Sequence, residues 1–267
     1  MALSTPLNAW LIHPTLTWEM IKRDITGRYR GANFGLLWSL ISPFLMLGVY
    51  TLAFGFVLKS RWPGATGSTT DFAMLLFIGL IVHGFFAECL TRAPSLIIGN
   101  VNLVKKIVFP LDVLSWVVVS SALFHAVMNF AVYALLEFLI RGSLDAKFLL
   151  LPLILAPLIM VCLGTVWILS ALSVYLRDIG QVTGVVATAM LFLSSAIIPV
   201  EILPESYQRI FMLNPLTFII DQARNVAFWG RLPDFQGIAI YSLFAFLFAC
   251  AGFAVFQKMR RGFSDVV

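Results

Sequence analysis

Residues 148–176 read FLLLPLILAPLIMVCLGTVWILSALSVYL and contain no Asp, Glu, Lys or Arg. A helix of about 20 predominantly apolar residues is long enough to cross the hydrocarbon core of a bilayer. The run is continuously apolar, whereas strands of a membrane β-barrel alternate apolar and polar residues over about ten positions. This stretch therefore predicts a transmembrane helix and an all-α integral membrane fold.

Five further stretches without these charged residues extend the prediction along the chain. Charged residues make up only 12% of the sequence and hydrophobic residues 60%, with a mean hydropathy of +0.95. A soluble domain carries about a quarter charged residues, so a surface in contact with lipid is the better explanation. The sequence predicts six transmembrane helices, with the other five in residues 31–58, 72–87, 113–136, 179–200 and 235–257.

The distribution of basic residues predicts the orientation. An even number of spans places both termini on one side of the membrane, and segments on that side contain eleven of the 18 Lys and Arg residues. Because cytoplasmic segments are enriched in Lys and Arg, both termini are expected in the cytoplasm. We expect one domain over residues 1–267: an interface helix (1–31), a six-helix membrane domain (32–257) and a cytoplasmic tail (258–267).

The segment before the first span has the pattern of an amphipathic helix. Pro14 can open a helix, and Trp18, Ile21, Ile25 and Tyr29 then recur on one face, with charged residues on the other. Such a helix lies in the membrane interface. It is either a plain membrane anchor or a surface that also contacts a cytoplasmic partner.

The segment joining the second and third spans, residues 91–110, contains two prolines that bracket a short helical stretch. Lys105 and Lys106 lie near its end. The segment is either a connector or a cytoplasmic coupling helix that transmits motion from a soluble motor into the membrane domain.

The segment ahead of the last span, residues 201–234, is predicted to form a re-entrant hairpin on the outer side. Its uncharged piece, residues 210–220, is too short to cross the bilayer and is interrupted by Asn214-Pro215. Short apolar segments of this kind are tolerated at membrane depth where they are buried in protein or line a wet cavity.

The sequence lacks the motifs of an enzyme that could supply its own energy. There is no GxxxxGK[ST] loop for ATP phosphates, no HExxH or GxSxG motif, and no metal-ligand spacing among the three cysteines. We therefore expect no catalytic residues, no metal and no cofactor in this chain. For His83 and His125, packing is the simpler interpretation, and a proton-relay or substrate role is the alternative. The basic residues lie at the ends of the apolar runs, which argues against nucleic acid as a partner.

Aromatic side chains within the predicted spans are candidates for a substrate channel. Their flat apolar faces suit sugar rings, and the alternative is packing or anchoring at the membrane interface. The candidates are Trp38, Phe44, Tyr50, Phe85 and Phe86.

A series of short motifs resembles the ABC-2 type permeases that export polysaccharides such as O-antigen, capsule and teichoic acid. The resemblance covers nearly the whole chain. It departs from the usual family pattern at Ala32-Asn33 and at Ser195-Ala196, and the second departure bears on the outer gate. The motifs are RDITGRYRG (23–31), GLLW (35–38) with Pro43, YTLAF (50–54), NVNLVKKIVFP (100–110), YLRDI (175–179), Leu203-Pro204 and Asn214-Pro215.

The resemblance implies a transport subunit rather than an enzyme. It implies a homodimer in the bacterial inner membrane that binds two copies of a separate ATPase subunit, which holds ATP and Mg. The cargo would be a lipid-linked O-antigen or capsular polysaccharide, with periplasmic conduit proteins as candidate further partners. The alternatives are an ABC-2 exporter of another cargo, such as teichoic acid, a lipid or a drug, and a membrane-embedded transferase.

The resemblance also implies roles for particular residues. The residues expected to couple to the ATPase are Lys22, Arg23, Asp24, Arg28, Tyr29, Arg30, Ser95, Asn100, Leu103, Lys105 and Lys106. The residues expected at the outer re-entrant gate are Pro199, Pro204, Asn214 and Pro215.

Overall fold

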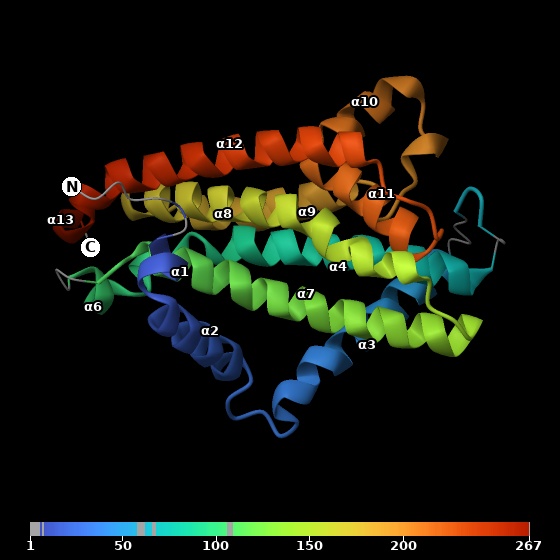
Figure 1. Cartoon of the computed structure of the whole chain (residues 1–267), viewed down its shortest axis with the longest axis horizontal. Helices are drawn as coiled ribbons and strands as arrows, with labels where there is room; N and C mark the ends of the chain where they lie inside the picture. Colours follow the sequence, from blue (N-terminus) through green and yellow to red (C-terminus); the bar gives the residue numbers. More distant parts are fainter. Residues whose placement is uncertain (1–5, 7, 58–61, 66–67, 106–108, 267) are drawn as a thin grey trace.

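Four long helices form the body of the protein (Figure 1). The computed structural model describes the chain except residues 1–5, 7, 58–61, 66–67, 106–108 and 267, and the described residues contain no β-strand. The long helices are α4 (Thr69–Arg92), α7 (Asp112–Arg141), α8 (Leu151–Tyr175) and α12 (Phe235–Met259). Each is long and apolar enough to cross a membrane.

Two shorter apolar helices occupy the places of the remaining predicted spans. The first is α3 (Trp38–Tyr50), which continues into a π-helical segment, Thr51–Val57, and the second is α9 (Ile179–Phe192). The 14 residues of α9 rise about 21 Å at 1.5 Å per residue, less than the hydrocarbon thickness of about 30 Å. The predicted all-α membrane fold is confirmed, with four described helices rather than six reaching spanning length and composition.

Helices α4, α8 and α12 run in one direction and α7 runs in the opposite direction, as contacts at both ends of the bundle indicate. At the end where α1 (Asn8–Ile12) and α13 (Phe263–Val266) lie, which we call the terminal end, the Tyr175 hydroxyl donates a hydrogen bond to the carbonyl of Met259 at 3.1 Å. At the opposite end, Arg141 pairs with Asp71 at 3.1 Å and joins the end of α7 to the start of α4. We call this the hairpin end, because α10 (Glu205–Leu213) and α11 (Pro215–Ala227) lie there.

Close backbone approach holds α12 against α8. A Cβ atom added to Gly252 would lie 2.7 Å from the carbonyl oxygen of Gly164, and one added to Gly164 would lie 2.6 Å from the ring of Phe248. Small residues at such crossings allow the van der Waals contact that stabilises helix pairs in lipid, where apolar burial alone offers little. The two glycines therefore determine the spacing of this helix pair.

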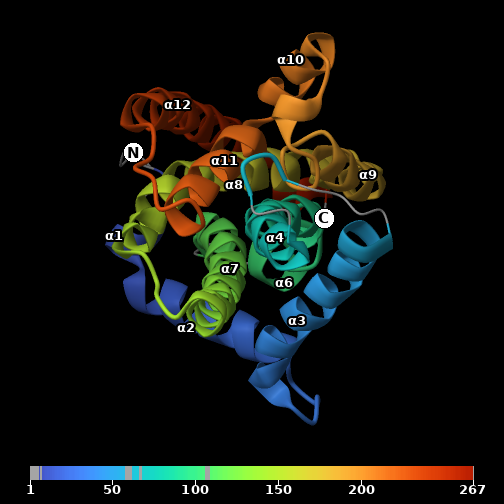
Figure 2. The same cartoon turned by 90° about the vertical axis from the view of Figure 1, so that its right-hand side faces the viewer.

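Large apolar side chains cover the outer faces of several helices. Leu243, Phe244 and Leu247 of α12 are more than half exposed, as are Leu45 and Val49 of α3. A soluble monomer rarely exposes apolar surface on this scale, so these faces suit lipid or another membrane-embedded protein. Viewed from the hairpin end, α3 stands to one side of the central helices, and α10 projects away from them (Figure 2).

Candidate functional site

Helix α2 (Pro14–Arg28) lies beside α7 at the terminal end of the bundle (Figure 1). Pro14 occupies the first helical position, where its missing N–H has no intrahelical partner to lose. Met20 and Ile21 are buried in the protein core, whereas Trp18 is 55% exposed. The helix expected before the first span is therefore present, with Ile21 on the protein side and Trp18 accessible to a membrane interface.

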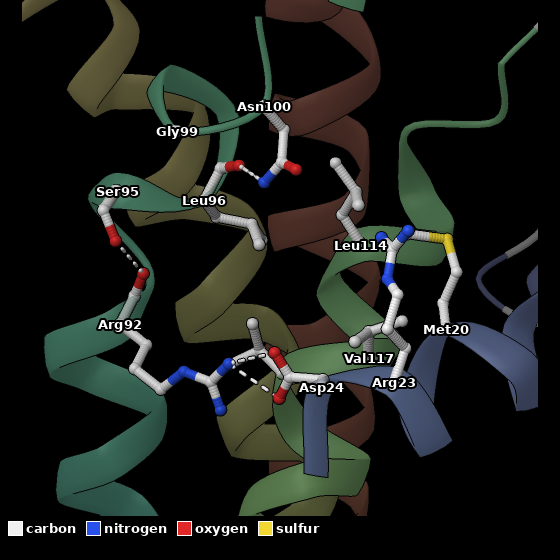
Figure 3. A pocket seen from close by; sticks show the side chains of 11 residues that line it. Met20, Arg23, Asp24, Arg92, Ser95, Leu96, Gly99, Asn100, Leu114 and Val117 are labelled. Carbon is white, nitrogen blue, oxygen red and sulfur yellow. Dashed lines mark hydrogen bonds and ion pairs between the residues drawn. The ribbon is translucent and has the colours of Figure 1, made fainter. Parts of the chain in front are cut away.

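An ion pair joins α2 to the last residue of α4. One guanidinium nitrogen of Arg92 donates hydrogen bonds to both carboxylate oxygens of Asp24, at 2.7 and 2.8 Å (Figure 3). Both side chains are about 30% exposed. Removing one member of a buried pair costs about 3–5 kcal/mol, and an exposed pair contributes about 0–1 kcal/mol. A contribution between these limits is expected for this half-buried pair.

Two short helices follow Arg92 directly. They are α5 (Ser95–Ile98) and α6 (Val101–Val104), separated by Gly99-Asn100. The Asn100 side-chain amide donates to the carbonyl of Leu96 at 2.9 Å, and the Ser95 hydroxyl donates to the carbonyl of Arg92 at 3.1 Å. The first bond ties the start of α6 to α5 and the second ties α5 to the last residue of α4, so the segment expected to couple to a partner is continuous with a membrane helix.

A pocket of about 310 Å³ separates α2 from this segment (Figure 3). Arg23 and Asp24 line one side, Ser95 and Asn100 the other, and apolar side chains of α7 contribute the third wall. The structure thus brings the two predicted coupling elements together around one pocket, at the Asp24–Arg92 pair.

A second carboxylate extends the ion pairs into the bundle. Glu88, one turn before Arg92, accepts hydrogen bonds from Arg92 at 3.2 Å and from Arg28 at 2.5 Å. His125 of α7 lies 3.1 Å from Glu88 and 3.0 Å from Arg28 through the same ring nitrogen, Nδ1. Tyr29 packs edge-on against His125 at 5.9 Å, and burial raises the pKa of its phenol. We call Asp24, Arg28, Glu88, Arg92 and His125 the ion network.

Sequence reasoning missed the network as a unit. The sequence alone favours packing for His125 and assigns no role to Glu88. The spacing of Glu88 and Arg92 places them on one helix face, as does the spacing of Asp24 and Arg28. That signal is visible in the sequence, but the pairing between the two helices is not.

The predicted coupling residues fall into two groups in the structure. Asp24, Arg28, Tyr29 and Asn100 make contacts within the protein. Five of the others are exposed: three lie on α2 or in the turn after it, and two lie in or directly after the α5–α6 segment. Leu103 is partly buried. Lys22 pairs with Glu19 at 3.3 Å on the surface. Lys106 lies outside the described residues. The exposed set is Lys22, Arg23, Arg30, Ser95 and Lys105.

A groove of about 420 Å³ runs between α3, α4 and α7 and meets the ion network. Trp38, Tyr50 and Phe85 line it, together with Arg28, Glu88 and His125. Phe44 is 39% exposed and does not line this groove. Phe86 is buried in the core and does not line it either. The groove therefore combines aromatic walls with a charged region.

A family model described as ABC-2 type transporter matches residues 15–228, which is most of the chain. The chain belongs to the ABC-2 type transporter family. The match begins in α2, includes the ion network and extends to the end of α11. This assignment agrees with the resemblance carried by the short motifs, and the protein is a multi-pass membrane permease.

Curated relatives of this ABC-2 permease are similar over nearly their full length. An O-antigen export system permease protein, RfbA, of Myxococcus xanthus is 24% identical and covers 93% of this chain and 94% of its own. A Klebsiella pneumoniae protein of the same name is 26% identical, with 92% of each chain covered. The polysialic acid transport protein KpsM of Escherichia coli is 22% identical, with 90% of this chain and 91% of its own covered.

At the hairpin end of the permease, Asn214 fastens the junction of α10 and α11 to the end of α9. Its side-chain amide donates to the carbonyls of Met190 and Leu193 at 3.0 and 3.1 Å, and its oxygen accepts from the N–H of Leu216 at 3.0 Å. Pro215 follows at the first position of α11, where a proline is favoured. The Asn214-Pro215 motif thus starts one helix and anchors it to another.

The two other proline positions of the predicted gate mark helix starts in the same region. Pro199 precedes a 3₁₀ turn, Val200–Ile202, and Pro204 precedes α10. Proline carries no N–H and has a fixed φ, so it begins such elements without losing an internal hydrogen bond.

Arg224 is a buried cation in α11 that sequence reasoning did not identify. It is 2% exposed, and its guanidinium donates to the carbonyls of Leu75, Ser195 and Ala196 at 3.0, 2.6 and 3.0 Å. It also stacks over the Trp62 ring, 4.0 Å from the centroid. Arg224 therefore holds together α11, α4, the turn after α9 and the loop before α4.

The described residues contain no group of three or more His, Cys, Asp or Glu side chains arranged to hold a metal ion. The ion network is instead built from paired charges on three helices. These pairs join α2, α4 and α7 to one another at the terminal end of the bundle.

Proposed function

We propose that this permease exports a lipid-linked polysaccharide, of the O-antigen or capsular class, across the bacterial inner membrane. Its relatives, named for O-antigen export and polysialic acid transport, match it over at least nine-tenths of each chain. Two copies would enclose the path, since a closed two-fold pair is the commonest symmetric assembly. Two copies of a separate ATPase, holding ATP and Mg, would supply the energy.

The observation that carries the coupling mechanism is the Asp24–Arg92 ion pair. A partner that displaces α5 and α6 moves the end of α4, because Arg92 lies only three residues before Ser95. The same arginine holds Asp24, so α2 moves with it. Small rigid shifts of this kind are how packed helices pass motion between sites.

The exposed residues beside the pair form the proposed docking surface for the ATPase. Arg23 and Lys105 are accessible on α2 and immediately after α6. Their positive charge suits an acidic partner surface, whose attraction speeds association and selects the partner. The groove lined by Trp38, Tyr50 and Phe85 is the proposed path of the glycan, entered from the side of the ion network.

The proposed topology has six spans, with the terminal end in the cytoplasm. The α3 helix with its π-helical continuation, and α9 with the turns after it, would supply the two spans beyond the four long helices. The hairpin formed by α10 and α11 would lie at the outer face. A cysteine at Ser206 should react with an impermeant maleimide in intact cells, and one at Ser264 only after permeabilisation. The reverse pattern would overturn the orientation.

Deletion of the gene for this chain tests the cargo. Cells should lose surface polysaccharide and accumulate the lipid-linked glycan inside, and a plasmid copy should restore export. An unchanged amount of surface polysaccharide would overturn the proposal.

A second experiment tests the docking surface for the ATPase. Arg23→Glu together with Lys105→Glu should reduce co-purification of the ATPase with the permease, whereas Lys147→Glu at the hairpin end is the matched control. Equal recovery of the ATPase with all variants would contradict the proposed docking surface.

A further inference from the structure

A second polar pocket lies at the hairpin end, on the opposite side of the molecule from the ion network. Its volume is about 420 Å³, within the range of small-molecule sites. Four segments contribute to it: the loop before α4, the 3₁₀ turn after α9, α11 and the loop before α12. Figure 2 looks onto this end, where the loop before α4 passes beside α11.

The floor of this pocket is rigid. Arg224 and Trp62 form it, and both are buried. The three backbone carbonyls bound by the guanidinium hold Arg224 in place, and Trp62 is stacked on it. A ligand would therefore meet a preorganised surface, which lowers the entropy lost on binding.

The rim of the pocket presents hydrogen-bonding groups. Asp221 and Asn225 lie one turn apart on α11 and line it together. Glu201 and Arg231 line it from the two loops, and both are exposed. Within the part of the chain that the structure describes, the side chains of Glu201 and Arg231 make no hydrogen bond or ion pair. Asp221 is paired with Arg224 at 3.5 Å, and the Asn225 amide donates to the Gln222 side chain at 3.4 Å. The Glu201 carboxylate can accept hydrogen bonds from two neighbouring hydroxyl groups, and the Asn225 side-chain oxygen can accept one more.

An aromatic wall completes the pocket. Trp229 is partly buried and packs edge-on against Phe228, with ring centroids 4.8 Å apart. Gly64 lies beside it, since a Cβ atom there would be 3.7 Å from the edge of the indole. The guanidinium carbon of Arg231 lies 5.6 Å from the centroid of the indole. The rest of the ring offers an apolar surface to the C–H face of a sugar ring.

The charges of the pocket argue against a polyanion. Glu201 and Asp221 carry two negative charges, and Arg224 and Arg231 carry two positive charges. The guanidinium of Arg224 is already directed at backbone carbonyls and at the Asp221 carboxylate, 3.5 Å away. A phosphate site would need an excess of donors and positive charge, whereas an uncharged ring with adjacent hydroxyls needs both donors and acceptors.

We propose that this pocket binds an uncharged sugar residue of the exported glycan. This inference rests on the proposed function, because it takes the glycan as the molecule that reaches the outer face. The pocket would hold the chain as it emerges at the hairpin end.

Binding can be measured by calorimetry on the permease–ATPase complex in lipid nanodiscs. The probe is the delipidated surface polysaccharide of the same cells, cut to short oligosaccharides. Asn225→Ala and Glu201→Gln should each weaken binding about tenfold, because each removes hydrogen bonds to a hydroxyl. Glu205→Gln, an exposed carboxylate on α10 that does not line the pocket, is the matched control. Periodate cleaves bonds between adjacent hydroxyl-bearing carbons. Periodate-treated oligosaccharide should therefore bind the unaltered complex no more tightly than untreated oligosaccharide binds the weakest rim variant.

Three results would overturn the assignment of this pocket as a sugar-binding site. They are absence of binding to the unaltered complex, equal affinity of the rim variants and the control, or displacement of the oligosaccharide by inorganic phosphate. Surface polysaccharide after gene deletion is measured in parallel. If deletion abolishes it while the rim variants bind normally, only the pocket assignment fails. If deletion leaves it unchanged, the proposed function fails.

Discussion

Asp24 and Arg92 lie 68 positions apart in the chain, yet one nitrogen of the arginine contacts both oxygens of the aspartate. The pair joins an interface helix to the end of a membrane helix at the point where the coupling segment begins. The proposed coupling mechanism uses this contact to make the two elements move as one body. It also gives the coupling mechanism a test that depends on charge rather than on packing.

Reversing the pair should separate its electrostatic role from a merely structural one. Asp24→Arg alone should reduce export at least tenfold, because it places two guanidinium groups together. Adding Arg92→Asp should recover much of the export, since it restores an opposite-charge pair with position 24 while Arg28 remains to pair with Glu88. Export is measured as surface polysaccharide per permease detected in the membrane. Glu19→Arg, at an exposed surface pair, should export normally. Failure of the double variant to exceed the single variant would contradict this role.

Loss of the Arg224 guanidinium should destabilise the hairpin end. Arg224→Met keeps much of the side-chain volume but leaves three buried carbonyls without their donor. Each unsatisfied buried group costs about 1–3 kcal/mol, so a loss of several kcal/mol in the free energy of unfolding is expected. Thermal unfolding in detergent measures it. Arg209→Met, at an exposed position of α10, is the control. Equal melting temperatures for the two variants would show that Arg224 does not fasten these segments.

Enlarging Gly252 should push α12 away from α8. Gly252→Val places side-chain atoms where the carbonyl of Gly164 already lies 2.7 Å from the first added carbon. Overpacking of this kind costs about 1–3 kcal/mol, which thermal unfolding can resolve. Gly184→Val in α9 is the comparison, because nothing lies within 4 Å of its added carbon. A smaller loss for Gly252→Val than for Gly184→Val would contradict the close crossing.

The groove makes a prediction about which aromatic residues serve export. Trp38→Ala and Tyr50→Ala should reduce glycan export several-fold at normal permease abundance, because both rings line the groove. Phe44→Ala removes a similar ring from the same helix but outside the groove, and it should export normally. Equal export by all three variants would contradict a role for the groove and favour another cargo or another path.

The membrane character of this protein follows from local composition and was predictable from its sequence. A run such as residues 148–176 is too long and too apolar to be stable in contact with water. In lipid, its backbone N–H and C=O groups must form hydrogen bonds within the segment, so the segment forms a helix. The interface helix at Pro14 and the Asn214-Pro215 junction were predictable for the same reason, because caps and prolines act over a few residues. The roles assigned to coupling and gate residues came from the family resemblance and remain predictions.

Only the tertiary structure decided which distant side chains meet. Glu88 and His125 are unremarkable in sequence, and their pairing with Arg28 depends on how α2 crosses α4 and α7. Likewise, the residues next to Arg224 in the sequence do not indicate that it binds carbonyls of α4 and of the turn after α9. Hydrophobic length is a property of one segment, whereas an ion pair or a pocket belongs to segments that only folding brings together.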